Sequence, residues 1–357
     1  MKNAVREYFP GSNTPEGFFS YYDYILNSRE ANRIIVLKGG PGTGKSTFMK
    51  RVATHFLSLG YDIELLHCSS DPDSLDGVCV RDAGFLILDG TAPHVVDPKA
   101  PGAVDEIINL GNCWDKEKML RCKNTIIDTN EKISEKFARA YRYLEAAKSL
   151  QEQISRDLSL LTDDLGIKAE MLDAAKRIVP DGGNGKEGHE RKAFLSAITP
   201  LGRVNYIDTF VKNAECVYSI EAEFVPDSGK FMTGIAQLLL QNGVDIHTFY
   251  CPMSPDKKLE HIYVPQSGLF ITTQNTYHRA KSAENEYVTD LNKYVKMRDV
   301  TLDTVSDMEF YNLLINRASD TIAEAKELHD ELEKNYIPNM DFDMVETLYT
   351  NLIESIN

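Results

Sequence analysis

The sequence contains no long apolar run, which excludes a membrane-spanning helix, since such a helix needs about 20 predominantly apolar residues. Positive charge is also scarce, because 39 Lys and Arg face 54 Asp and Glu, giving a net charge of −15 at pH 7. So acidic a chain is not expected to bind nucleic acid or an anionic membrane. The six cysteines include no C-x-x-C pair, so we expect reduced thiols rather than a metal site. The first residues, Met1–Glu7, lack the apolar core of a signal peptide, which favours a cytoplasmic location.

What the chain does contain is typical of a globular protein. Hydrophobic residues make up 42% of it and charged residues 26%. A length of 357 residues predicts two domains, each large enough to bury its own core.

One glycine-rich stretch dominates the sequence, because residues 39–46 fit the phosphate-binding pattern G-x-x-x-x-G-K-[ST]. The apolar run 33–38 before it predicts a buried strand, and the apolar spacing after it predicts a helix that stops at Gly60. A loop between a strand and a helix N-terminus favours phosphate, through free N–H groups and the helix dipole. The predicted nucleotide-binding residues are Gly39, Gly40, Pro41, Gly42, Thr43, Gly44, Lys45, Ser46 and Thr47.

Two further roles follow from this pattern. Lys45 would reach the β- and γ-phosphates, and Ser46 would ligate Mg²⁺. A later predicted strand, Gly84–Asp89, ends in an aspartate. In P-loop proteins, an aspartate at the end of such a strand contacts Mg²⁺. We therefore predict Lys45 and Asp89 as catalytic residues and Ser46 and Asp89 as metal ligands. No Asn-Lys-x-Asp motif for guanine is present, so ATP is the expected nucleotide.

The residue that would activate water is less obvious. Asp89 is followed by Gly-Thr instead of the glutamate that many P-loop ATPases use. The candidates are Glu64, Asp71, Asp73, Asp76, His94 and Asp97. His94, just beyond that strand, has the best position for a base, although a purely structural histidine is the alternative. The acidic stretch Cys68–Gly77 predicts a loop, either solvated or forming a wall of a substrate pocket.

The middle of the chain predicts helices and a boundary. Apolar residues spaced three and four apart between Glu131 and Leu161 predict a long helix, and Ile167–Ile178 predicts a second helix antiparallel to it. A glycine-rich linker, residues 179–189, separates two predicted domains. The fold class is therefore α/β, with two tandem P-loop-like domains of mostly parallel sheet, residues 1–180 and 190–357, each ending in a helical hairpin.

The second domain repeats the first. Thr14-Pro-x-Gly17 recurs as Thr199-Pro-x-Gly202, and Phe48-Met49 recurs 183 residues later as Phe231-Met232. Such ordered matches indicate duplication and predict an intramolecular pseudo-dimer. The repeat has lost the phosphate-binding residues, because Glu223, Asp227, Ser228 and Thr273 replace Gly40, Gly44, Lys45 and Asp89. We therefore expect one nucleotide per chain.

With these stretches, the chain resembles a family of bacterial P-loop proteins found mostly in Firmicutes, whose activity is unassigned. The motifs that carry the resemblance are Lys38–Ser46, Cys68–Gly77, Asp89–Lys99 and Pro101–Gly111. The resemblance covers nearly the whole chain and implies the tandem P-loop architecture and ATP binding.

Three functions fit these observations. The first is an ATPase or ATP-driven switch, whose helical hairpins transmit the nucleotide state to a partner protein. The second is a phosphotransferase, in which the acidic stretch and His94 hold a small acceptor. The third is a nucleotide sensor or scaffold without turnover.

Overall fold

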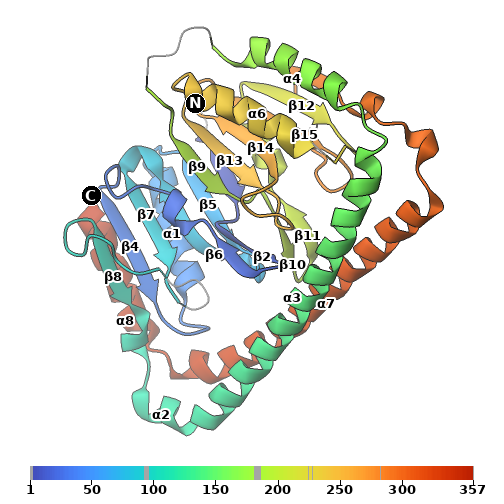
Figure 1. Ribbon diagram of the computed structural model, residues 1–357. Helices are drawn as coiled ribbons and strands as arrows, with labels where there is room; N and C mark the ends of the chain where they lie inside the picture. The colour runs from blue at the N-terminus through green and yellow to red at the C-terminus, as the bar shows by residue number, and fades with distance from the viewer. Residues whose placement is uncertain are drawn as a thin grey trace.

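The computed structural model describes residues 3–91, 96–180, 186–223, 225–226, 228–281 and 283–356. They form an α/β structure of two lobes, each built on a mixed sheet, with two long helices crossing beside both lobes (Figure 1). The predicted α/β class is therefore confirmed.

In the first lobe, the described residues form a six-stranded sheet with the order β1-β5-β6-β7-β4-β8. Strand β6 runs antiparallel to its two neighbours, whereas the other pairings are parallel. The strands are β1 (Val5–Tyr8), β4 (Arg33–Lys38), β5 (Ile63–Cys68), β6 (Asp71–Val80), β7 (Phe85–Asp89) and β8 (Asp105–Asn109).

The second sheet has the equivalent order, β9-β13-β14-β15-β12-β16, and the equivalent antiparallel strand, β14. The strand and helix equivalent to β4 and to the helix after the glycine-rich stretch lie 183 residues after those of the first lobe, as the sequence repeat predicts. The strands are β9 (Glu190–Ala193), β12 (Cys216–Glu221), β13 (Ile246–Tyr250), β14 (Leu259–Val264), β15 (Leu269–Gln274) and β16 (Glu286–Asp290). Each lobe also carries a hairpin: β2 (Gly11–Thr14) with β3 (Gly17–Ser20), and β10 (Ser196–Thr199) with β11 (Gly202–Asn205).

Helices complete each lobe and join the two. The α-helices are α1 (Lys45–Ser58), α2 (Lys116–Arg121), α3 (Lys123–Ser159), α4 (Asp164–Ile178), α5 (Ile207–Lys212), α6 (Ser228–Gln241), α7 (Leu302–Tyr336) and α8 (Phe342–Ile356). Short 3₁₀ turns include η1 (Tyr22–Tyr24), η2 (Arg81–Ala83), η3 (Leu110–Cys113), η4 (Asn292–Tyr294), η5 (Met297–Asp299) and η6 (Ile337–Asn339).

Two expectations about these elements are wrong. The acidic stretch Cys68–Gly77 is mostly strand β6 rather than a loop, because its apolar residues are buried in the sheet and Asp76 is paired with Tyr22. The hairpin predicted between α3 and α4 does not form either. Helix α3 instead lies antiparallel along α7, where Lys136 meets Glu324 and Asp157 accepts a hydrogen bond from Thr304.

The last helix of each half of the chain, α4 or α8, packs on the lobe formed by the other half. Helix α4, which follows the first lobe in sequence, contacts α6 of the second lobe. Helix α8, at the end of the chain, contributes Val345 and Leu352 to the core beneath α1 of the first lobe (Figure 1). The apolar spacing in the sequence predicts which face of each helix is buried, but not which element covers it. The packing of α4 and α8 on the other lobe could therefore not be predicted from spacing.

The two lobes meet around an approximate two-fold axis. Phe9 and the equivalent Phe194 exchange both backbone hydrogen bonds, at 2.9 and 3.0 Å. The Phe9 ring also packs on Tyr206, at 5.0 Å between centroids, and Phe194 packs on Tyr21 at 4.8 Å. One apolar cluster spans both lobes, so they share a core.

Candidate functional site

The glycine-rich stretch forms a loop between β4 and α1, as predicted. Strand β4 ends at Lys38, and α1 begins at Lys45 with Gly44 as its N-cap. Gly42 and Gly44 have φ angles of 64° and 87°, in the left-handed region that glycine adopts without a Cβ penalty. The loop therefore presents backbone groups beside a helix N-terminus, a position that suits an anion.

Lys45 lies at the centre of this loop. Its Nζ donates to the carbonyl oxygens of Gly39 and Gly40, both at 2.8 Å. The same Nζ lies 3.6 Å from Asp89 Oδ2, and both side chains are nearly buried. The structure thus brings together two of the three residues predicted to be catalytic.

The remaining loop residues differ in how they are held. Thr43 is buried, and its hydroxyl donates to Gly40 O at 2.8 Å, which braces the turn that contains the half-buried Pro41. Ser46 Oγ accepts a hydrogen bond from the Leu75 amide at 3.1 Å, while Thr47 is exposed. Ser46 is thus fixed against strand β6, with its hydroxyl proton still available to donate.

Asp89 ends strand β7, where it pairs with Leu37 of β4. Its Oδ1 accepts a hydrogen bond from the Thr91 amide at 2.8 Å, and the Thr91 hydroxyl donates to Gly39 O at 2.8 Å. Thr91 therefore links the aspartate to the loop, a role that sequence reasoning missed. His94, the third predicted catalytic residue, lies outside the described residues.

The connection between α7 and α8, residues 336–342 and called the elbow below, packs against the glycine-rich loop. An added Cβ on Gly40 would lie 2.6 Å from the Tyr336 ring, and one on Gly42 would lie 2.8 Å from Ile337. Phe342, the first residue of α8, approaches Gly44. No signal in the sequence predicts this contact, because the elbow lies almost 300 residues after the loop.

Charged residues of α7 also face this region. Lys326 forms an ion pair with Asp71 at 3.9 Å. Partial burial lowers the pKa of His329 below its usual value, and the nearby Lys45 charge lowers it further, against the pull of Glu333 and Asp330. His329, which was not predicted from the sequence, is therefore electrostatically coupled to the loop.

The equivalent edge of the second lobe has different chemistry. Ser228 begins α6 at the position of Lys45 and is buried. Glu223, at the position of Gly40, accepts a hydrogen bond from the Thr276 hydroxyl and lies 3.8 Å from an Arg279 nitrogen. Asp227, the predicted replacement for Gly44, lies outside the described residues. The carboxylate of Glu223 would repel a triphosphate.

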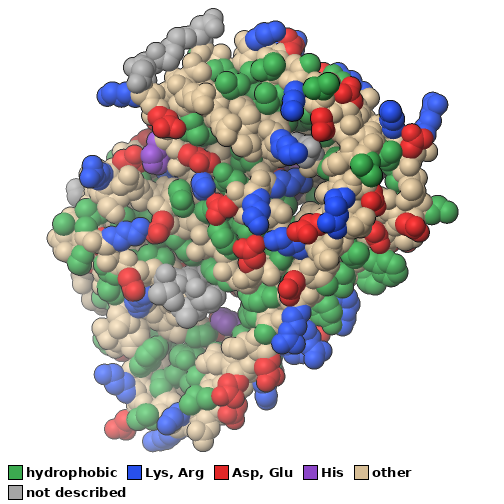
Figure 2. Space-filling model, in the orientation of Figure 1, with side chains coloured by type: hydrophobic (Ala, Val, Ile, Leu, Met, Phe, Trp, Pro, Cys, Tyr) green, Lys and Arg blue, Asp and Glu red, His purple; other side chains and the backbone are tan. Residues whose placement is uncertain are grey.

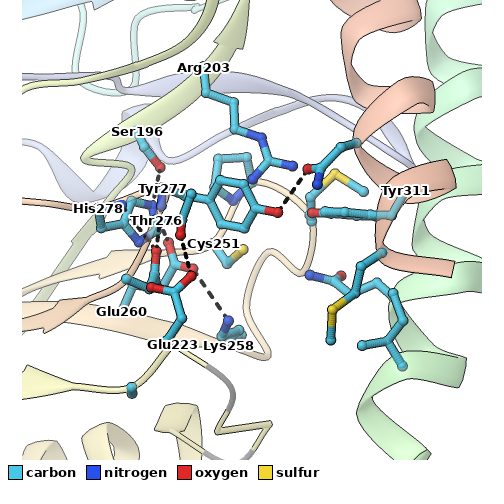
Figure 3. Close-up of a pocket in the computed structure, with 18 of the residues that line it drawn as sticks. Ser196, Arg203, Glu223, Cys251, Lys258, Glu260, Thr276, Tyr277, His278 and Tyr311 are labelled. Carbon is cyan, nitrogen blue, oxygen red and sulfur yellow. Dashed lines mark hydrogen bonds and ion pairs between the residues drawn. The ribbon is translucent and has the colours of Figure 1, made fainter. Parts of the chain in front are cut away.

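A pocket of about 350 Å³ opens at this edge (Figure 3). Its size falls in the range of small-ligand sites, at the carboxyl ends of the strands where such folds bind ligands. Residues of α3 and α7, the loop after β12, strand β14 and the segment after β15 all contribute to it. Sequence reasoning predicted no site here.

The walls of this pocket carry several polar groups. The Arg203 guanidinium stacks on the Tyr277 ring at 3.6 Å from its centroid, and the Tyr277 hydroxyl donates to Asn312. Opposite them, Glu260 lies 3.6 Å from Lys258 Nζ, and His278 lies behind it (Figure 3). Burial, reinforced by the Glu260 charge, raises the pKa of the Cys251 thiol to about 12, so this cysteine stays protonated.

Comparisons with protein-family models, curated proteins and solved structures found no match to this chain. No described helix is long and apolar enough to cross a bilayer. Lys and Arg side chains are interspersed with Asp and Glu over the face seen in Figure 2. The geometry of the two sheet edges therefore indicates what the chain can bind.

Proposed function

We propose that this chain binds one Mg·ATP at the loop Gly39–Ser46 and works as an ATP-hydrolysing switch in the cytoplasm. The observation that carries the proposal is the position of Lys45, at the start of α1, between two loop carbonyls and Asp89. A triphosphate would attract Lys45 away from these carbonyls, and Mg²⁺ would take Ser46 and Asp89 as oxygen ligands.

The switch follows from what covers the loop. Tyr336 packs against Gly40 and Ile337 against Gly42, so a movement of the loop backbone would displace the elbow. The elbow belongs to α7, which continues along α3 to the second lobe. The exposed faces of α3 and α7 are then the surfaces on which a partner protein would sense the nucleotide state.

The phosphotransferase alternative receives less support. It relied on the acidic stretch to hold an acceptor, but Asp76 is buried and bonded to the Tyr22 hydroxyl at 3.0 Å. Asp71 accepts from Ser74 and pairs with Lys326. These carboxylates are engaged in the fold, which favours the switch.

Isothermal titration of the full chain with Mg²⁺ and a non-hydrolysable ATP analogue tests the proposal. We expect one nucleotide per chain and no detectable binding by Lys45→Ala. At about 100 times Kd, the analogue would stabilise the wild type by about 2.7 kcal/mol, and it would not shift the melting temperature of the variant.

Incubation of the same full chain with Mg²⁺ and ATP distinguishes the three functions. ADP release without an acceptor supports the switch, turnover only with an added metabolite supports a phosphotransferase, and tight binding without turnover supports a sensor. Undiminished stabilisation of Lys45→Ala, or a second nucleotide site that survives this substitution, would refute the proposed site.

A further inference from the structure

Two consecutive polar residues of strand β14, Glu260 and His261, lie close together in the second lobe. The pairing of β13 with β14 shifts in register, because Phe249 opposes His261 and Tyr250 opposes Leu259. Glu260 is therefore the extra residue of a bulge, a device that re-aims a side chain. This explains how consecutive residues, normally on opposite faces of a strand, lie on the same side of the sheet.

His278 completes a compact cluster with Glu260 and His261. One ligand atom from each of these three residues lies within 4.8 Å of the others, and all three side chains are at least nine-tenths buried. Among the described residues, Glu260 Oε2, His261 Nε2 and His278 Nδ1 have no hydrogen-bond partner, although Glu260 Oε2 lies 3.4 Å from His278 Nε2. Buried polar atoms are normally satisfied, so one unbonded polar atom on each of these three clustered residues indicates a ligand.

The other nitrogen of each imidazole is held by a hydroxyl. His261 Nδ1 lies 2.8 Å from Thr272 Oγ1, and His278 Nε2 lies 3.2 Å from Ser196 Oγ. Such contacts orient the ring, and where the imidazole nitrogen donates to the hydroxyl, the opposite nitrogen keeps its electron pair, as around metal-bound histidines.

We infer that Glu260, His261 and His278 bind one divalent transition-metal ion of the zinc class. Two imidazoles and one carboxylate suit Zn²⁺ and similar ions, whereas Mg²⁺ and Ca²⁺ prefer oxygen ligands alone. Small side-chain rotations bring atoms within 4.8 Å to the closer spacing that a shared ion requires.

The ion would be accessible to a small molecule. Glu260 and His278 both line the pocket of about 350 Å³, whose opposite wall carries Arg203 and Tyr311 (Figure 3). Three protein ligands leave a coordination position open, as in catalytic rather than structural zinc sites. The site is separate from the proposed nucleotide loop and does not depend on it.

Cobalt titration of the EDTA-treated full chain, without nucleotide or Mg²⁺, tests the inference. We expect one equivalent of Co²⁺, with visible bands of a four- or five-coordinate ion, no sulfur charge-transfer band, and displacement by Zn²⁺. Glu260→Gln and His261→Gln should each weaken Co²⁺ binding at least about 100-fold, since losing even an outer partner of a ligand costs about 10–100-fold.

Two further variants distinguish a metal site from a structural cluster. His189→Gln removes an exposed imidazole outside the cluster and should leave Co²⁺ affinity unchanged. Lys258→Met removes the ammonium 3.6 Å from Glu260 and should tighten Co²⁺ binding by relieving repulsion. Circular dichroism melting identifies any variant that fails to fold, in which case the other variants decide. Absence of a wild-type cobalt spectrum, or equal affinity in His261→Gln and His189→Gln, would overturn the inference.

Discussion

The ion pair between Arg191 of β9 and Glu64 of β5 joins the two lobes, and its removal should be costly. The Arg191 guanidinium donates to both Glu64 oxygens, at 3.1 and 2.7 Å, and also to the Tyr8 hydroxyl and Ile25 O. Burial by itself would raise the pKa of Glu64, but Arg191 outweighs it and holds that pKa well below its usual range.

Substitution of Arg191 by Met keeps much of the side-chain volume and leaves the Glu64 carboxylate buried. The Tyr8 hydroxyl, at 2.8 Å, and Arg81, at 3.9 Å, remain near it. Breaking a buried pair in this way costs about 3–5 kcal/mol of unfolding free energy. The double variant with Glu64→Gln should recover much of the loss, because no unpaired charge remains and Gln still accepts from Tyr8.

The effect should depend on pH with a defined sign. In the wild type, the lowered pKa of Glu64 stabilises the fold above the unfolded value of about 4.3, and this contribution is lost as the pH falls further. In Arg191→Met, burial is opposed mainly by the more distant Arg81 and should raise that pKa instead, so protonation restores stability as the pH falls. The difference between the two proteins should therefore shrink from about pH 8 to about pH 5.

Urea titrations at both pH values, followed by circular dichroism, measure these differences. The matched control is Arg33→Met, which removes a more exposed arginine paired with Glu106 and should cost about 0–1 kcal/mol. A cost for Arg191→Met below about 1 kcal/mol, or one independent of pH, would refute the reasoning.

Two predictions concern the loop in the first lobe. Asp89→Asn should weaken Mg²⁺-dependent nucleotide binding by about 1.5–3 kcal/mol and metal-free binding much less, and equal effects in titrations with Mg²⁺ and with EDTA would contradict the metal role. Gly40→Ala would place a Cβ 2.6 Å from the Tyr336 ring and should cost about 1–3 kcal/mol by overpacking. In a Tyr336→Ala background the same change should be nearly neutral in urea unfolding, and additive costs would show that the elbow does not press on the loop.

Local patterns in the sequence predicted the first lobe's central elements well. The apolar run Arg33–Lys38 is β4, and the helical spacing after the glycines is α1. Both are specified by periodicity and by glycine conformation, which act over a few residues. Strand β6 was missed because its aspartates and glycine favour a loop, whereas Tyr22, far away in sequence, satisfies the buried Asp76.

Features that depend on tertiary contact could not be predicted in this way. The stripe of α3 fits any apolar partner, and the small residues Ala140 and Ala147 give no indication that α7 is the partner. Similarly, the pair Glu260-His261 appears in the sequence as two opposite faces of a strand. Only the bulge in its pairing brings both to one point.

The two lobes place different chemistry at equivalent edges of their two sheets. In the first lobe, Lys45 begins α1 and is drawn to loop carbonyls, an arrangement that favours an anion. In the second lobe, a serine begins α6, Glu223 faces the edge, and buried imidazoles lie below it. The negative charge of Glu223, which would repel a triphosphate, is compatible with a bound cation. The C-terminal end of α7 borders the glycine-rich loop of the first lobe, and α3 lines the pocket of the second lobe. Neither lobe alone therefore contains every residue that borders its own sheet edge.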